Sequence, residues 1–226
     1  MRTVKTWAAA AAAAMLALAG TAQASPMTLV DGGLGVLDSG TNLEWTANMN
    51  LGGLMSWAAA NTWIATLNTS NYAGHHDWRL PTLNPSDTSC SHNFNPGGGF
   101  SQQYDGYYCT GGELSNLFVT NLGNRAGQSV LNQTGDTAEQ IANLALFNNV
   151  VPFTYWSGTE YAPNPDRAWL FRPGDGGQAY DGKIVRLRAV AVRPGDVVAS
   201  VPEPQTLALA LLALGATVVA RRRRPA

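Results

Sequence analysis

The chain has 226 residues, of which 45% are hydrophobic, 9% aromatic and only 13% charged. Segment 26–201 holds 8 Lys and Arg against 14 Asp and Glu, a formal charge of −6, together with six of the seven tryptophans. So many aromatic side chains do not fit a disordered chain. The acidity of the segment argues against a partner with a phosphate backbone, so no nucleic acid is expected to bind.

The N-terminus has the pattern of a secretory signal peptide. Arg2 and Lys5 precede an apolar run over 7–18, and Ala22-Gln23-Ala24 supplies a small-x-small cleavage site. The apolar run is short for a membrane anchor. We therefore predict a signal peptide over 1–25.

Short strands and one amphipathic helix are predicted next. Glycines mark turns around short strands in 28–36, and a turn over 38–41 leads into a strand over 43–45. Apolar residues then recur at spacings of three and four, which predicts a helix from about 53 to 67. Its apolar face consists of Leu54, Trp57, Ala60, Ile64 and Leu67.

The stretch Asp77-Trp78-Arg79-Leu80-Pro81-Thr82 is predicted to form an extended corner after this helix. Pro81 ends any helix and biases Leu80 towards an extended conformation. Alternation then places Trp78 and Leu80 on one side, where we expect them to be buried. Arg79 points the opposite way, where we expect it to bind loop carbonyls or a carboxylate.

Segment 84–106 is polar and rich in Gly, Pro and Ser, so we expect a surface loop there. The chain has two cysteines, Cys90 and Cys109, and the exported context favours a disulfide between them. One alternative is a metal site that adds His92, which would need a fourth ligand and a reducing compartment. A catalytic thiol is a further alternative, but the partner cysteine would quench it.

Two short helices are predicted in the middle of the chain. Thr110 and Glu113 have the spacing of a capping box, ahead of a helix that runs to about residue 118. A second, weak helix is expected over 136–146, with Asp136 as its cap.

The last third is predicted to be β structure, with turns at 173–177 and 181–182. The predicted strands are 153–157, 168–171, 178–180 and 185–192. In the last of these, alternation gives two faces, which are Val185, Leu187, Ala189 and Ala191 against Arg186, Arg188, Val190 and Val192.

The C-terminus has three parts in a fixed order. They are Val201-Pro202-Glu203-Pro204, an apolar run over 207–220, and Arg221-Arg222-Arg223-Arg224. As a helix the run is about 21 Å long, short of the roughly 30 Å hydrocarbon core, so it makes a marginal transmembrane helix. Its arginines would face the cytoplasm.

This order resembles the PEP-CTERM sorting signal. The resemblance implies transient membrane anchoring through the C-terminal helix and cleavage near Pro-Glu-Pro by an exosortase-type protease. It also implies export across the inner membrane of a Gram-negative bacterium, to the cell surface or extracellular matrix. The chain therefore divides into a signal peptide over 1–25, one domain over 26–200 and a sorting signal over 201–226.

Several short pieces, in order from about residue 31 to 196, resemble the Lcl C-terminal-domain family. They are Leu43-Glu44-Trp45, Trp57-Ala58-Ala59-Ala60, Asp77-Trp78-Arg79-Leu80-Pro81-Thr82, Gly112-Glu113-Leu114, Tyr155-Trp156-Ser157-Gly158-Thr159-Glu160, Ala168-Trp169 and Val192-Arg193-Pro194-Gly195. The resemblance implies an α+β, C-type-lectin-like fold, with two main helices packed on short antiparallel β-sheets with long loops. The family is named after a bacterial surface adhesin, so the resemblance also implies adhesion.

The candidate ligand-binding residues lie in the β-rich last third. They are Glu160, Asn164, Asp166, Trp169 and Asp175. The first three cluster on one loop, and hard oxygen ligands of this kind suit Ca²⁺. The calcium strings of C-type lectins, Glu-Pro-Asn or Gln-Pro-Asp followed by Trp-Asn-Asp, do not occur in the chain, so no cofactor is expected.

The chain contains no G-x-S-x-G, H-E-x-x-H or P-loop motif, so no catalytic residue is assigned. We predict a secreted, non-enzymatic binding module for extracellular polysaccharide or another surface partner. The alternatives are a hydrolase that acts on polysaccharide, through two of the 14 acids, and a purely structural protein of the biofilm matrix.

Overall fold

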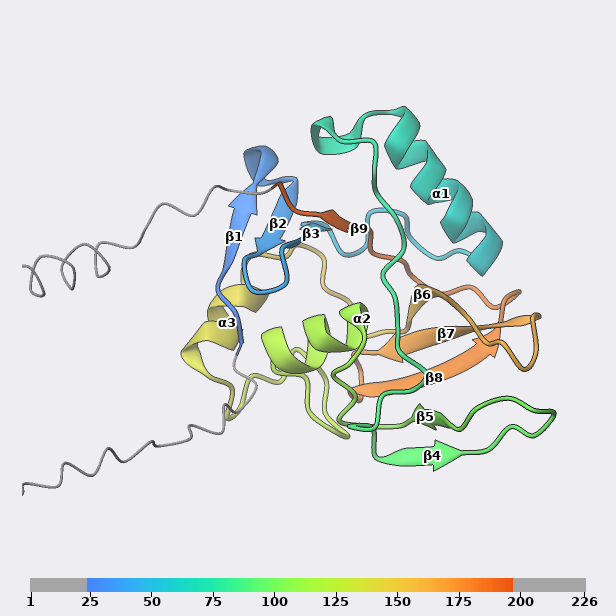
Figure 1. Cartoon of the computed structure of the whole chain (residues 1–226). Helices are drawn as coiled ribbons and strands as arrows, with labels where there is room; N and C mark the ends of the chain where they lie inside the picture. Colours follow the sequence, from blue (N-terminus) through green and yellow to red (C-terminus); the bar gives the residue numbers. More distant parts are fainter. Residues whose placement is uncertain (1–23, 197–226) are drawn as a thin grey trace, which may run out of the picture.

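The computed structural model describes residues 24–196. The predicted signal peptide, apart from its last two residues, and the sorting signal over 201–226 lie outside the described residues. Three antiparallel sheets and three α-helices make up the described part (Figure 1), which confirms the predicted α+β class. Between residues 24 and 196, no helix is long and apolar enough to cross a bilayer.

The first sheet joins the beginning of the domain to its end. Its strands, in spatial order, are β1 (Met27–Val30), β2 (Gly35–Asp38), β3 (Leu43–Thr46) and β9 (Val192–Pro194). A 3₁₀ turn, η1 (Asp31–Gly33), connects β1 to β2. Trp45 on β3 pairs with Val36 on one side and Val192 on the other, so the centre of this sheet is buried.

The second sheet is a meander of three consecutive strands, which are β6 (Tyr155–Glu160), β7 (Arg167–Arg172) and β8 (Gly177–Gly182). The strands predicted in this region are confirmed, with shifted ends. Beside β8 lies a hairpin of β4 (His92–Phe94) and β5 (Gln103–Asp105), linked to it by a bridge between Gly106 and Gln178 (Figure 1). Both hairpin strands belong to the segment predicted as a loop.

The three-stranded sheet separates two hydrophobic cores, because successive side chains of a strand point to opposite faces. Tyr155, Trp169 and Phe171 enter the larger core, which also contains Trp45. Trp156, Ala168 and Leu170 enter the smaller core on the opposite face, against the helix α1.

Helix α1 (Trp57–Thr69) buries Ala60, Ile64 and Leu67 in the smaller core, as predicted. The predicted start near residue 53 is wrong. Ser56 caps the helix, since its hydroxyl accepts a hydrogen bond from the Ala59 N–H. Leu54 lies before this cap and is 45% exposed.

The middle helices are α2 (Glu113–Ser115), which continues as a π-helix over Asn116–Asn121, and α3 (Ala138–Leu144). Both predicted caps are wrong. The Gly112 N–H donates to Ser115 Oγ, and Glu113 is engaged by Arg79 instead of closing a capping box with Thr110. Thr137 caps α3 in a capping box with Gln140, one residue after the predicted cap.

The prediction of one continuous strand over 185–192 is wrong, although the two predicted faces of this segment are confirmed. Leu187, Ala189 and Ala191 enter the smaller core, while Val190 and Val192 enter the larger one. The backbone of this extended segment changes partners along its length. It bonds in turn to Met55, Thr154, Thr46 and Arg79, so no single neighbouring strand pairs with all of it.

The predicted corner is confirmed, with Trp78 and Leu80 both buried. Arg79 points away from them and binds a carboxylate, that of Glu113. The Arg79 backbone exchanges two hydrogen bonds with Val192, each 2.9 Å long, so the corner lies beside β9. A disulfide between Cys90 and Cys109 is also confirmed, and it excludes the metal site and the catalytic thiol that were the alternatives.

Candidate functional site

A cavity of about 300 Å³ lies between the four-stranded sheet and the start of α2. Two segments far apart in the sequence form its walls. They are lined by Asp38, Thr41, Leu43 and Trp45 on one side and by Thr110, Gly111, Gly112, Glu113 and Asn116 on the other.

Asp38 forms part of the cavity wall and organises the turn between β2 and β3. Its carboxylate accepts hydrogen bonds from the Gly40 N–H (2.9 Å), the Thr41 hydroxyl (2.7 Å) and the Asn121 side-chain amide (2.8 Å). It also accepts one from the Ser25 hydroxyl. These donors fix the carboxylate as an acceptor, and its orientation is set before any ligand arrives.

Glu113 contributes a second fixed carboxylate. The Arg79 guanidinium donates to both of its oxygens at 2.6 Å, and the Thr82 N–H donates to one of them at 2.9 Å. Burial alone would raise the pKa of Glu113, but the hydrogen bonds from Arg79 and the Thr82 N–H lower it overall. This carboxyl therefore stays ionised at neutral pH.

Trp45 supplies an unused hydrogen-bond donor. Its side chain lines the cavity and is only 1% exposed, and its indole N–H has no partner among the described residues. Buried indole N–H groups usually have a partner, because an unpaired donor costs free energy. The N–H itself has almost no accessible surface, so a ligand oxygen in the cavity would satisfy it only after a small movement of the side chains around Trp45.

Hydrogen bonds to Asp87 fix the segment 110–112, which forms one rim of the cavity. The backbone N–H groups of Thr110 and Gly111 donate to one oxygen of this carboxylate at 2.7 and 2.6 Å. Burial opposes the charge on Asp87, but hydrogen bonds from Ser89, Gly111 and Thr110 lower its pKa. Cys109 precedes the rim, so the disulfide ties the same segment to the loop at Cys90.

Because residue 112 is a glycine, this rim can lie close to the backbone at Leu83. A Cβ at this position would lie 2.7 Å from the Leu83 Cα, which is closer than atoms approach in real structures. The resulting site combines fixed acceptors, a buried donor, hydroxyl and amide groups, and an apolar wall. Such a set suits a small ligand with several hydroxyl groups.

The predicted ligand-binding residues lie outside this cavity, and the structure brings only some of them together. Glu160 ends β6, and Asn164 and Asp166 follow it in the connection to β7, whereas Asp175 lies in the turn from β7 to β8, at the opposite end of the sheet. Trp169 is fully buried in the larger core.

These loop residues are engaged locally. Glu160 pairs with Lys183 at 3.0 Å, and the Asn164 side-chain oxygen accepts from the Asp166 N–H at 3.0 Å. Asp175 accepts from the Arg172 side chain and from the Gly177 N–H. The binding role assigned to these residues stays a prediction.

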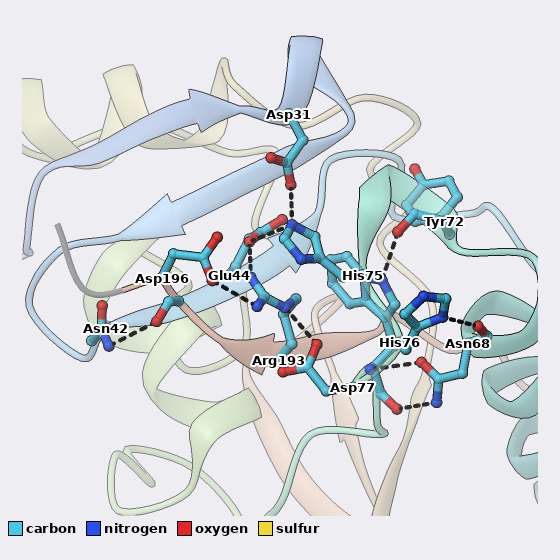
Figure 2. A network of polar contacts seen from close by, with 12 residues as sticks. Asp31, Asn42, Glu44, Asn68, Tyr72, His75, His76, Asp77, Arg193 and Asp196 are labelled. Carbon is cyan, nitrogen blue, oxygen red and sulfur yellow. Dashed lines mark hydrogen bonds and ion pairs between the residues drawn. The ribbon is translucent and has the colours of Figure 1, made fainter.

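A second polar cluster surrounds Arg193, and Figure 2 shows its side chain between three acids from different parts of the chain. The guanidinium donates to Glu44 at 2.6 Å, to Asp77 at 2.7 Å and to Asp196 at 2.9 Å. Burial opposes the charge of Arg193, but the hydrogen bonds to these acids raise its pKa. Arg193 therefore joins β9 to β3 and to the corner.

Glu44 is the least ordinary acid of this cluster. Its side chain is 3% exposed, and burial together with the neighbouring Asp31 raises its pKa to about 7, although Arg193 acts in the opposite direction. His75 Nε2 lies 2.9 Å from Asp31 Oδ2 and 3.9 Å from Glu44 Oε2 (Figure 2).

Neither group of residues is predicted as a site from the sequence. The sequence predicts a turn over 38–41 and a helix cap for Glu113, and no motif assigns a role to the Arg193 cluster. The signal that pointed to them is the set of short ordered pieces, because Leu43-Glu44-Trp45, Gly112-Glu113-Leu114 and Val192-Arg193-Pro194-Gly195 contribute to the cavity or the cluster.

Comparison with known proteins identifies two regions of the chain. Residues 200–224 match the PEP-CTERM protein-sorting motif, which marks the chain as exported and as a substrate for sorting by exosortase-type machinery. No curated protein and no solved structure matches the chain. Residues 35–193, which include the cavity walls and most of the Arg193 cluster, match the Lcl C-terminal domain, and the chain belongs to this family.

Proposed function

We propose that this domain is a non-enzymatic, C-type-lectin-like binding module that holds one sugar unit of an extracellular polysaccharide in the cavity beside Trp45. The observation that carries the proposal is Trp45, whose side chain lines the cavity and whose buried indole N–H has no partner among residues 24–196. The sorted protein would then act at the cell surface or in the extracellular matrix.

The chemistry of the lining supports a sugar. Asp38 and Glu113 are fixed acceptors for hydroxyl groups, and Trp45 is a donor for a hydroxyl or ring oxygen. Leu43 adds apolar surface for the carbon face of the ring. A volume of about 300 Å³ is at the lower end of ordinary ligand pockets, so it suits one sugar unit and not a long segment.

The protonation states favour binding over hydrolysis. A glycosidase needs one carboxyl group that is protonated near neutral pH, with a raised pKa. Glu113 has a lowered pKa. Glu44, whose pKa is raised to about 7, does not line the cavity and faces Arg193 instead.

The test uses two matched tryptophans. Both Trp45 and Trp169 are buried with an unpartnered indole N–H, but only Trp45 lines the cavity. We expect Trp45→Phe to weaken binding of the bacterium's own polysaccharide by about fivefold, the value of one hydrogen bond of about 1 kcal/mol. Trp169→Phe should change stability to a similar extent and leave binding unchanged.

The same incubation distinguishes the other functions through the release of new reducing ends. Retention of the polysaccharide without new reducing ends supports a binding module. Reducing ends that disappear with Glu113→Gln, or with Glu160→Gln or Asp166→Asn, would indicate a hydrolase. Retention lost only with Glu160→Gln or Asp166→Asn would move the site to the β6–β7 loop, and no retention at all would leave a structural matrix protein.

A further inference from the structure

Three side chains that can bind a metal converge beside the four-stranded sheet. Asp31 lies in η1, Glu44 on β3, and His75 directly after η2 (Tyr72–Gly74). One ligand atom from each lies within 4.8 Å of the other two. Figure 2 shows the three side chains pointing toward one another, with Arg193 below Glu44 in the view.

The separations of these atoms are close to those around a bound ion. Ligands at 2.0–2.2 Å from a tetrahedral Zn²⁺ are about 3.4 Å from each other. His75 Nε2 lies 2.9 Å from Asp31 Oδ2 and 3.9 Å from Glu44 Oε2, on either side of that value. Since all three ligand atoms lie within 4.8 Å of one another, side-chain movements of about an ångström would place them around one ion.

An independent observation points to a missing partner at this place. Glu44 Oε1 is buried and has no hydrogen-bond partner in the described part of the chain, while Oε2 is bound to Arg193. The side chain is 3% exposed, so bulk water does not compensate the free oxygen. A Cβ on Gly35 would lie 2.3 Å from this oxygen, so the glycine leaves the space that the carboxylate occupies.

The local charge is also unbalanced. The cluster contains four carboxyl groups, those of Asp31, Glu44, Asp77 and Asp196, and a single guanidinium. Arg193 is already shared by three of these acids, whereas Asp31 contacts His75. A divalent cation would offset much of the negative charge of these acids and would favour the ionised form of Glu44.

We propose that Asp31, Glu44 and His75 bind one divalent transition-metal ion, with Zn²⁺ the best match to the ligand set. One imidazole and two carboxylates suit Zn²⁺ better than Ca²⁺, which takes oxygen ligands in larger number. The ion joins the β1–β2 connection to β3 and to the segment that leads into the corner. Three protein ligands leave one coordination position for water.

The test is a Zn²⁺ titration of the purified, chelator-treated full chain, prepared without a histidine tag. Calorimetry should show one ion bound per chain, and the melting temperature should rise with Zn²⁺. We expect His75→Ala and Asp31→Asn to weaken Zn²⁺ binding by more than about tenfold, since even indirect partners of a metal site contribute this much. Co²⁺ in place of Zn²⁺ should give the absorption bands of a four- or five-coordinate site.

Two histidines provide matched controls. His76 is the exposed neighbour of His75 and contacts the Asn68 carbonyl, and His92 is an exposed histidine that pairs with Asp105. His76→Ala and His92→Ala should both bind Zn²⁺ like the wild type. The proposal is overturned if the wild type binds no Zn²⁺, if Ca²⁺ binds and Zn²⁺ does not, or if Asp31→Asn and His75→Ala bind as well as the wild type. In those cases His75 is simply the hydrogen-bond partner of Asp31.

Discussion

The domain contains two arginine–glutamate pairs with the same 2.6 Å separation but with opposite shifts in the pKa of the carboxyl group. In one, Arg79 binds Glu113, and the pKa of the carboxyl is lowered. In the other, Arg193 binds Glu44, and the pKa of the carboxyl is raised to about 7. The two pairs sit on neighbouring extended segments, since Arg79 is bridged to Val192.

The difference comes from the surroundings of each carboxyl group. Glu113 is 22% exposed, has Arg79 on both of its oxygens and accepts a backbone N–H as well. Glu44 is almost fully buried, shares its arginine with Asp77 and Asp196, and has Asp31 nearby. A short distance to a cation therefore does not decide whether a carboxyl group stays ionised, because burial and competing acids count as much.

The largest effect is expected from Arg193→Met. This change leaves Glu44 buried without its cation and also removes the partner of Asp77 and Asp196, so we expect a loss of about 3–5 kcal/mol in the free energy of unfolding. Urea denaturation measures it. Arg186→Met, at an exposed arginine, is the control and should change stability by less than about 0.5 kcal/mol. A loss below about 1 kcal/mol for Arg193→Met would mean that the cluster is not a buried ion network.

The pH dependence of Glu44 gives the next largest effect. Its folded-state pKa is raised from 4.5 to about 7 by burial and Asp31, with Arg193 opposing and His75 also facing it. The group therefore contributes stability that is complete below pH 4.5 and is lost as the pH rises through about 7. The difference between the two pKa values corresponds to about 3 kcal/mol of folding free energy. In a chelating buffer, Glu44→Gln should gain stability relative to the wild type between pH 4.5 and 8. A constant difference across this range would contradict the raised pKa.

Arg79→Met should have a smaller effect. Arg79 is 40% exposed, so solvent screens the pair and the loss should be about 1 kcal/mol. A double-mutant cycle with Glu113→Gln measures the interaction itself. A coupling energy as large as that between Arg193 and Glu44 would remove the proposed distinction between the pairs.

The smallest effect is the pH dependence of Glu113, and its sign is opposite to that of Glu44. Since its pKa is lowered, Glu113 contributes stability that is present above pH 4.5 and is lost as the pH falls through the folded-state pKa. The stability difference between the wild type and Glu113→Gln should therefore shrink on acidification. A difference that grows on acidification would show that the carboxyl is protonated in the folded protein.

Much of the fold was predictable because short-range patterns determine it. Alternation predicted the correct faces for 185–192. The extended conformation imposed by Pro81, together with alternation, predicted that Trp78 and Leu80 are buried, and the exported context predicted the disulfide. Pairing partners were not predictable in this way. The backbone of 185–192 finds its hydrogen bonds on segments that are far away in the sequence, so its extended form was foreseen and its lack of one partner strand was not.

The cavity and the Arg193 cluster could not be read from spacing, because each collects residues from distant segments. Asp38 and Glu113, or Glu44 and Arg193, come together only after the sheets have formed. One misplacement was avoidable. In a meander, consecutive turns lie at opposite ends of the sheet, so Asp175 and the Glu160 loop could not have formed one site.

The place of β9 has a mechanical consequence. β9 ends at Pro194, close to the sorting motif that begins at residue 200, and is hydrogen-bonded to β3 on one side and to the corner on the other. In a protein held by its C-terminal end, tension enters the domain through this strand. Arg193 lies on this strand, so it is among the first residues to bear the force. Its three acids attach it to β3, to the corner and to the segment after β9. The cluster therefore lies where a pulling force is first resisted, and rupture of the domain under load should begin with the separation of β9 from its neighbours.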